Sequence, residues 1–266
     1  MAIATITTGV VTSWGGTENS ALITGGSAPS EFTLNSGADE FDTTALNGSG
    51  VSAMTRAPGM YNVSGSIRTR VEPMRLGTGG FITASGAYLT NLKGWNLNIT
   101  RPAFPADVQV NGTGTAYREF LPGIYSWGGS WTAFFDATTP VVLPGTAYTA
   151  AVFKILEEAA GTDHTLTGNI VTTGMGVPVK VGDLSQVTYN FEGSGALTSA
   201  GSGAVTPIFA VGAWPSSAAG ALVLQAVTNQ TFSLSAFWTR IGLSVPVDGP
   251  ITVDIDFQGT GALTIG

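Results

Sequence analysis

The residues best suited to acid–base chemistry lie near the middle of the chain. His164 is the only histidine, and Glu157, Glu158 and Asp163 stand just before it. An imidazole close to carboxylates can act as a general acid or base. This group follows a segment that reads as a charged helix end, where polar side chains usually lie in solvent. We therefore predict a solvated surface cluster here, and not a catalytic site.

A second candidate is the pair Asp254 and Asp256, which are spaced two apart on a predicted strand. This spacing places both carboxylates on one face, as a metal ion would require. No third ligand with metal-site spacing is nearby, and the related segment has Thr188 and Asn190 at these positions. We expect no metal site and no bound cofactor.

Known catalytic signatures are missing from the sequence. It has no Gly-x-Ser-x-Gly elbow, no phosphate-binding loop, no dinucleotide fingerprint and no His-Glu-x-x-His. We predict that the protein is not an enzyme.

The tryptophans suggest contacts with other molecules or with a core. Trp14, Trp127 and Trp131 lie in glycine-rich surroundings, which suits stacking on a ligand or burial at a subunit interface. We favour the interface. Trp95 and Trp238 lie in predicted strands, and we expect both in the core.

The composition points to a globular protein with an unusually neutral surface. The chain has 266 residues, 43% of them apolar, which is enough for a sizeable core. Only 10% are charged, against about 25% in a typical soluble domain. A surface with so few charges gives the protein little protection against association. We therefore predict that copies of the chain cover much of this surface.

The charge and the termini exclude several classes. A net charge of −7 argues against sequence-specific binding to nucleic acid, because phosphates are repelled. The absence of cysteine excludes disulfides and thiolate chemistry. We find neither a secretory signal nor an apolar stretch long enough for a membrane helix, and we expect synthesis in a cytoplasm with no membrane partner.

Two stretches of the sequence each occur twice, as internal repeats. Asn47-Gly48-Ser49-Gly50, followed by Pro58-Gly59-Met60-Tyr61 and Gly65-Ser66, returns 64 residues later as 111–114, 122–125 and 129–130. The segment 190–198 returns 66 residues later as 256–264. Such fixed spacing predicts an internal duplication, in the order front half, front half, back half, back half.

Most of the remaining chain reads as strands and turns. Residues 1–38 are rich in Gly, Ser and Thr and predict an N-terminal arm or loop with at most two strands. Such a segment is either mobile or clamped by a neighbouring subunit, and we favour the second. Alternating apolar residues predict strands within 39–70, 88–110, 165–176, 186–191, 231–242 and 251–257.

Four arginines gather in one hairpin, and we predict that they pair with carboxylates on a solvated strand face: Arg56, Arg68, Arg70 and Arg75.

Two segments have helical spacing. Residues 148–161 carry apolar side chains at 148, 152, 155, 156 and 159 and end at Gly161, which predicts a helix of about three turns. Residues 218–227 predict a weaker counterpart, because a glycine interrupts them.

The elements together predict a mainly β fold, a β-sandwich or barrel with one or two short helices, internally duplicated. Two arrangements fit this order. In the preferred one an inner β unit, 86–199, is inserted into an outer β unit made of 39–85 plus 200–266. In the other, four quarters form one large sandwich.

Two motifs resemble a known family. The hairpin Tyr117-Arg118-Glu119-Phe120-Leu121-Pro122-Gly123-Ile124, with the strand Ser130-Trp131-Thr132, and the closing segment 256–263 resemble the tail tube proteins of long-tailed bacteriophages. The resemblance covers mainly residues 90–198 and the last thirty, and Trp95 and Asp107-Val108 fit it. The front copy departs from it, with Met54-Thr55-Arg56 in place of Arg118-Glu119-Phe120.

The resemblance implies a β-sandwich or barrel of tail-tube type, flanked by a helix, whose sheets join around a ring. Rings stack into a hollow tube that conducts the genome. Six copies form the ring in family members with a single unit, so this chain would form a ring of three or six chains. A low surface charge suits burial between copies, and an acidic balance suits a channel through which DNA slides.

We therefore expect a structural virion protein of the tail. Its partners would be copies of itself, other tail proteins and passing DNA, which it would not bind sequence-specifically. A capsid decoration protein or a surface β-sandwich adhesin module is the alternative, and self-polymerisation separates the two. We predict interface positions in the glycine-rich stretches and hairpins: Trp14, Arg56, Tyr61, Arg68, Arg70, Arg118, Phe120, Tyr125, Trp127 and Trp131.

Overall fold

The computed structural model describes a chain built of strands. The described residues are 10–15, 29–42, 56–70, 81–84, 87–88, 92–106, 117–134, 141–156, 161–179, 182–202, 212–214, 219–227, 230–246 and 249–266. No helix occurs among them, so the mainly β prediction is confirmed for this part of the chain.

The strands are long and alternate in burial. Their bounds are β1 (Val10–Trp14), β2 (Pro29–Asp42), β3 (Arg56–Arg70), β4 (Phe81–Ala84), β5 (Ala87–Tyr88), β6 (Leu92–Thr100), β7 (Ala103–Ala106), β8 (Glu119–Pro122), β9 (Ser126–Phe134), β10 (Ala147–Leu156), β11 (Thr162–Gly176), β12 (Gln186–Ser202), β13 (Gly212–Trp214), β14 (Gly220–Val227), β15 (Gln230–Pro246), β16 (Thr252–Gly259) and β17 (Thr264–Ile265).

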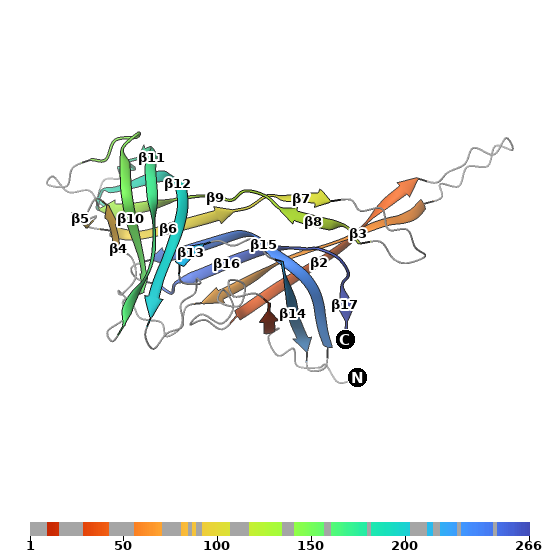
Figure 1. Cartoon of the computed structure of the whole chain (residues 1–266). Coiled ribbons are helices and arrows are strands. Elements are labelled where there is room, and N and C mark those ends of the chain that lie inside the picture. The colour runs from red at the N-terminus through yellow and green to blue at the C-terminus, as the bar shows by residue number, and fades with distance from the viewer. Residues whose placement is uncertain are drawn as a thin grey trace.

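One antiparallel sheet holds fifteen of these strands. Its central run has the order β2-β3-β16-β15-β6-β9-β12-β11, and β7 and β8 form a separate hairpin. β15 and β16 lie beside β6 and β9 in the middle of the molecule (Figure 1). The central run is therefore a continuous surface made from segments far apart in the sequence.

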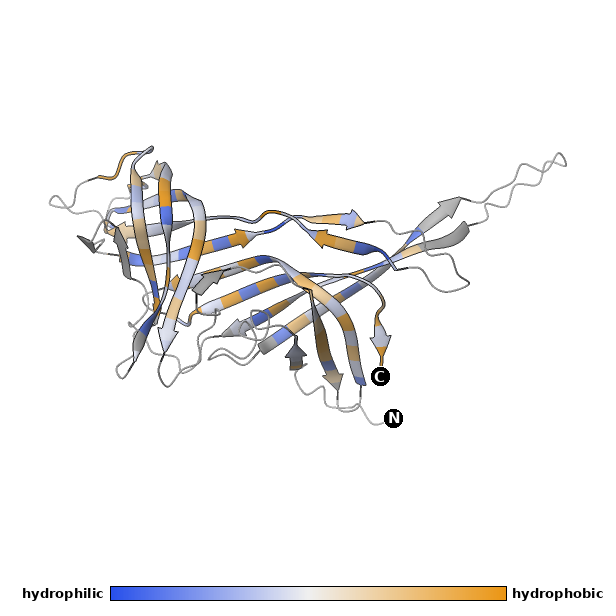
Figure 2. Cartoon of the chain, viewed as in Figure 1, coloured by the Kyte–Doolittle hydropathy of each residue, from blue (hydrophilic) through white to orange (hydrophobic). Residues whose placement is uncertain are grey.

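Strands that continue from β15 and from β11 form a second layer over one face of this run. The first part of β15 pairs with β14, which pairs with β1. At the end of the run β11 pairs with β10, which pairs with β4. In Figure 1, β10 and β11 stand across the left end of the sheet, and β14 and β17 lie below its middle. The hydrophobic core lies between the layers, and orange and blue positions alternate along the strands (Figure 2).

The helix predicted over 148–161 is wrong, because residues 147–156 form β10. Ala151, Phe153 and Ile155 are buried and alternate with more exposed residues, as in a strand. A β-bulge shifts the pairing with β11 between Tyr148 and Ala151, where Ala150 has a φ of 51°. The extra residue places Tyr148 and Ala151 three positions apart instead of two, so the spacing of apolar residues resembles that of a helix.

The second predicted helix, over 218–227, is also wrong. β14 occupies Gly220–Val227 and has partners on both sides, β1 and β15. Leu222 and Leu224 are completely buried and two positions apart. Pairing on both edges overrides the weak helical preference of this segment.

The two halves of the central run are paired in corresponding registers. Phe257 of β16 lies opposite Gly65 of β3, and Phe191 of β12 lies opposite Gly129 of β9. These positions differ by 66 and 64 residues, the spacings of the sequence repeats. The register of β15 on β16 shifts between residues 238 and 240, and that of β11 on β12 shifts between residues 172 and 174.

The halves also correspond to the predicted outer and inner units. β3, β16 and β15 come from the outer unit, whereas β6, β9 and β11 come from the inner one, as does β12 up to residue 199. Most of β2 lies in the predicted N-terminal arm. β4 lies in the outer range but pairs with β10 of the inner unit. The division into domains stays a prediction. β1 lies within the predicted N-terminal arm, 1–38, and β2 begins in it. Residues 1–9 and 16–28 of the arm lie outside the described residues.

Candidate functional site: the polar face of the sheet

The central run of the sheet has one polar face. Along β16 the buried residues Val253, Ile255 and Phe257 alternate with half-exposed Asp254 and Asp256. The same alternation continues on its neighbours. Hydroxyl, amide and charged side chains occupy this face on seven strands: Glu31, Thr33, Asn35, Ser64, Ser66, Arg68, Asn96, Asn98, Thr100, Ser126, Ser130, Thr132, Gln186, Thr188, Asn190, Glu192, Arg240, Ser244, Asp254, Asp256 and Gln258.

A ladder of charges crosses one half of this face. The guanidinium of Arg68 donates to Asp254 Oδ1 at 2.6 Å and to Glu31 Oε1 at 2.9 Å. The hydrogen bond that Arg68 donates to Asp254, together with the charges of both carboxylates, raises the pKa of Arg68. Arg240 donates to Asp256 Oδ2 at 3.3 Å. These side chains line an open hollow of about 310 Å³.

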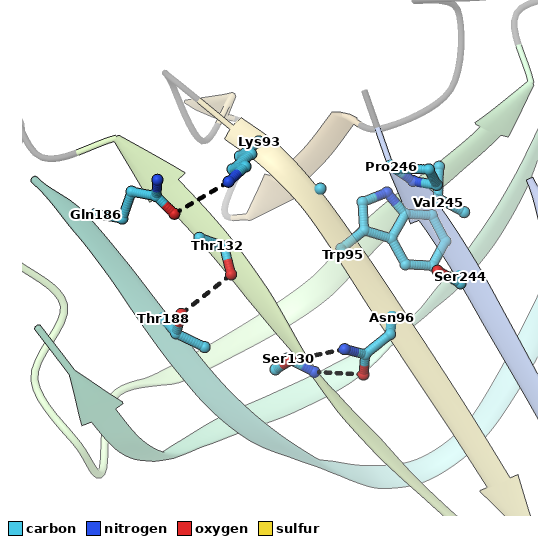
Figure 3. Close-up of a pocket in the computed structure, with 11 residues that line it drawn as sticks. Lys93, Trp95, Asn96, Ser130, Thr132, Gln186, Thr188, Ser244, Val245 and Pro246 are labelled. Atoms are coloured by element: carbon cyan, nitrogen blue, oxygen red, sulfur yellow. Dashed lines mark hydrogen bonds between the residues drawn. The ribbon is translucent and has the colours of Figure 1, made fainter. Parts of the chain in front are cut away.

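A second hollow, of about 320 Å³, lies on the other half of the face. Its side chains form cross-strand pairs of neutral groups and one pair between a lysine and an amide (Figure 3). Thr132 and Thr188 hydroxyls lie 3.1 Å apart, and Asn96 Nδ2 donates to Ser130 Oγ at 2.7 Å. The Lys93 ammonium donates to Gln186 Oε1 at 3.3 Å. Hydroxyls and amides that bond one another therefore satisfy much of their own hydrogen-bonding capacity across the strands.

The described residues do not assemble a metal site on this face. Asp254 and Asp256 share one face of β16 as predicted, but Arg68 and Arg240 engage them. No group of three or more His, Asp or Glu side chains in the described ranges is close enough to hold a metal ion.

His164 is placed differently from its prediction. It lies in β11 and is 3% exposed, so it is not part of a solvated surface cluster. Lys154 and Asp163 form an ion pair of 2.8 Å beside it. Glu157 and Glu158 lie outside the described residues. The prediction was wrong because the segment before His164 is a strand with a buried face and not a helix end.

The predicted interface tryptophans lie in the chain's own core. Trp14, Trp127 and Trp131 are 2%, 3% and 1% exposed. Trp127 donates from Nε1 to Gly195 O at 2.9 Å, and Trp14 from Nε1 to Ala236 O at 3.2 Å. The three rings cannot reach a partner without unpacking the core. The core prediction for Trp95 and Trp238 is confirmed, at 4% and 1% exposed.

Four other predicted interface residues lie at or near the hairpins. The Arg118 guanidinium donates to Asp39 Oδ2 at 2.8 Å, and its backbone N–H donates to Tyr61 O at 2.9 Å. Phe120 N–H donates to Thr260 Oγ1 at 3.2 Å. Tyr125 packs, half-buried, against the core. The polar contacts join the segment before β9 to β2, to β3 and to the residue after β16, so they organise the chain internally.

The arginine prediction is confirmed where the structure describes it. Arg68 pairs with two carboxylates on an exposed strand face, as expected. Arg56 and Arg70 lie in β3, and their side chains are outside the described residues, as is Arg75. The wider polar face was not predicted as a site. Its signal, a hydroxyl, amide or charge at every second residue of many strands, is present in the sequence, but the strands become neighbours only on folding.

The sequence matches no protein-family model and no curated protein. In the part of the chain that the structure describes, none of the elements is a helix long and apolar enough to cross a membrane.

Proposed function

We propose that the protein is the tube subunit of a long-tailed bacteriophage tail. In this proposal the chains assemble into rings of three or six, the rings stack, and the polar face lines the channel through which DNA passes. The protein is then a structural component of the virion with no enzymatic activity. Its partners are copies of itself, other tail proteins and the DNA in transit.

The observation that carries the proposal is the polar face of a sheet whose other face is covered. Strands of the chain's own second layer cover the apolar face. Within the described strands the polar face consists mainly of hydroxyl, amide and charged side chains, and the half-buried Phe134 at the end of β9 is an apolar exception. A broad polar wall of this kind suits the lining of a water-filled channel.

The charges on this face suit transit of DNA without retention. Duplex DNA is held by cations that neutralise its phosphates. Here Arg68 lies between Glu31 and Asp254, and Arg240 contacts Asp256. The net charge of the chain, −7, adds repulsion. A duplex would meet compensated arginines, neutral hydroxyls and the exposed Lys93, whose ammonium bonds to the neutral amide of Gln186. So few uncompensated cations favour sliding over binding.

We also propose that the chain consists of two copies of one β unit. The corresponding registers of Phe257 on Gly65 and Phe191 on Gly129 support this, together with the two glycines of positive φ, Gly195 at 78° and Gly261 at 90°, which are again 66 positions apart. Three chains with two units each would then give a ring of pseudo-sixfold symmetry.

Electron microscopy of the purified protein tests the assembly. We expect hollow rings or stacked tubes, with three or six chains per ring in class averages. Uniform monomers or compact oligomers that never stack at high concentration would contradict the proposal and favour the decoration or adhesin alternative.

Single cysteines test which face lines the channel, because the natural chain has none. Asn190→Cys lies at an exposed position of the polar face, and Ser235→Cys is the control at an exposed position of the second layer. In assembled particles we expect a bulky maleimide to label the Ser235→Cys variant quickly and the Asn190→Cys variant slowly, whereas both react alike in unassembled chains. Equal labelling in the particles would contradict a channel position for this face.

A further inference from the structure

The junction between the two halves of the sheet is an edge-to-edge contact. The last part of β15 pairs with β6, so that Ile241, Leu243 and Val245 lie opposite Ile99, Leu97 and Trp95. The three β15 side chains are at most 2% exposed. This contact closes the open edge of one half with the first strand of the other.

The direction of the backbone groups in this junction follows from one hydrogen bond. Arg101 N–H donates to Thr239 O at 2.7 Å. Hydrogen-bonded pairs alternate along an antiparallel ladder. Ile241, Leu243 and Val245 therefore direct their N–H and C=O groups toward β6.

In the other half of the sheet, β11 occupies the position that β15 has at the internal junction. Met175 lies opposite Tyr189 on β12, as Ile241 lies opposite Ile255 on β16, again 66 positions later. Val177 and Val179 stand 66 positions before Leu243 and Val245. β10 pairs with β11 only up to Val171, and Gly145 bonds to Thr172. Beyond that point the edge is open among the described residues, and Met175, Val177 and Val179 are 38%, 42% and 76% exposed.

The edge of β2 corresponds to the edge of β6 that pairs with β15 at the internal junction. Leu34 lies opposite Gly65 on β3, as Leu97 of β6 lies opposite Gly129 on β9, so β2 and β6 occupy equivalent positions in the two halves. In the described part of the chain β2 pairs with β3 and with no other strand. Between 32 and 38 it has no charged residue, and neither has the stretch 173–179. Uncharged open edges are templates for pairing with another chain.

We propose that the edge of β11, extended through Val179, pairs with β2 of a second copy of this chain. The internal junction fixes the register: Met175 opposite Ser36, Val177 opposite Leu34 and Val179 opposite Phe32. The contact buries the apolar side chains that the single chain leaves exposed. Because one chain offers two different edges, the contact is head-to-tail and continues from copy to copy until a ring closes.

Pro178 fits this ladder. Met175, Val177 and Val179 occupy the positions that direct backbone groups outward, so Pro178 directs its missing N–H toward β12. An edge proline is tolerated in that orientation, since it removes no bond from the new ladder.

The proposal rests on the proposed function, because it describes the contact that would join subunits of the tube ring. A disulfide test addresses it separately. Gly176 and Asn35 fall opposite each other in the proposed register, and both are exposed. A Cβ on Gly176 would meet no atom within 4 Å, so a cysteine fits there. In a correct register the two Cα atoms lie within disulfide range.

We expect Gly176→Cys/Asn35→Cys to form intermolecular disulfides on mild oxidation, visible as multimers on a non-reducing gel. The control Gly176→Cys/Thr33→Cys is shifted by two residues and should give roughly tenfold less product, because its Cα atoms lie out of range. Equal or absent cross-linking of the two variants would overturn the proposed register.

A charge at the edge provides a second test. Val177→Lys should leave the thermal unfolding of the monomer nearly unchanged, since the residue is exposed, and should abolish multimers. Multimers that survive this change would overturn the proposal. If Gly176→Cys/Asn35→Cys chains form hollow tubes but no disulfides, the tube function is supported and the β11–β2 contact is rejected. If they form disulfides in assemblies that have no channel, the contact is supported and the tube function is rejected.

Discussion

The ring of Phe257 covers Gly65, the residue directly opposite it on β3. A Cβ built on Gly65 would lie 2.5 Å from Phe257 Cζ and would also overlap Thr33 O. Phe191 covers Gly129 in the same way, with Asn96 O as the backbone neighbour. At both places the strands approach so closely that only glycine fits, and the aromatic ring fills the space above it.

Gly65→Ala and Gly129→Ala should each destabilise the fold by about 1–3 kcal/mol, because the methyl group meets backbone as well as a ring. Urea unfolding of the two variants measures this loss. Gly37→Ala is the control, since a Cβ there would meet nothing within 4 Å. If all three variants unfold at the same urea concentration as the natural chain, the close approach is not real.

Arg68→Gln should change the stability of the monomer by less than about 1 kcal/mol, because Arg68 and both its carboxylate partners are exposed to solvent. Arg118→Gln should cost more, since Arg118 is less exposed and its bridge to Asp39 is supported by the backbone bond to Tyr61. Unfolding in low and in high salt separates the two. A larger loss for Arg68→Gln would contradict this ranking.

Stability should fall as the pH rises above about 10, the ordinary pKa of tyrosine. Burial, and secondarily the neighbouring Tyr189, raises the pKa of Tyr148 in the folded chain. The unfolded chain therefore loses this proton at a lower pH than the folded chain, and deprotonation favours unfolding between the two pKa values. Tyr148→Phe should show a shallower decline in urea unfolding across that range, and an unchanged slope would refute this assignment.

Cations on the polar face should convert it from a sliding surface to a binding surface. Thr188→Arg adds a guanidinium group to this face, and the residues directly opposite position 188 are Thr132 and Gly176, which carry no carboxylate. We expect assembled particles of this variant to retain duplex DNA at low salt and to release it as salt rises. Ser235→Arg controls for the added charge, and equal DNA retention by the control would contradict a channel-lining role for the face.

Local patterns were sufficient for part of the fold. The alternation of polar and apolar residues predicted strands around Val253, Ile255 and Phe257, and these residues are buried on one face. The same alternation predicted that Arg68 would meet carboxylates on a solvated face. Both are properties of a strand with two faces, so neighbouring residues carry the information.

Other parts depended on contacts that no local pattern records. The bulge at Ala150 gave β10 a helical spacing. Glycines around the tryptophans suggested loops, yet they make room for the rings: a Cβ on Gly193 would overlap Trp127 Cε2, and one on Gly168 would lie 2.6 Å from Trp127 Cζ2. His164 was placed at the surface because the strand partner that buries it was not visible in the sequence.

The sequence by itself determined that the chain is mainly β, poor in charge and written in two spaced repeats, because composition, period and spacing are properties of the chain alone. Only the tertiary structure decided which strands are neighbours. It placed residues 31, 68 and 254 in one charge ladder and, among the described strands, left the edges of β2 and β11 open. Pairing between distant segments is fixed by burial of the shared core, which involves the whole chain at once.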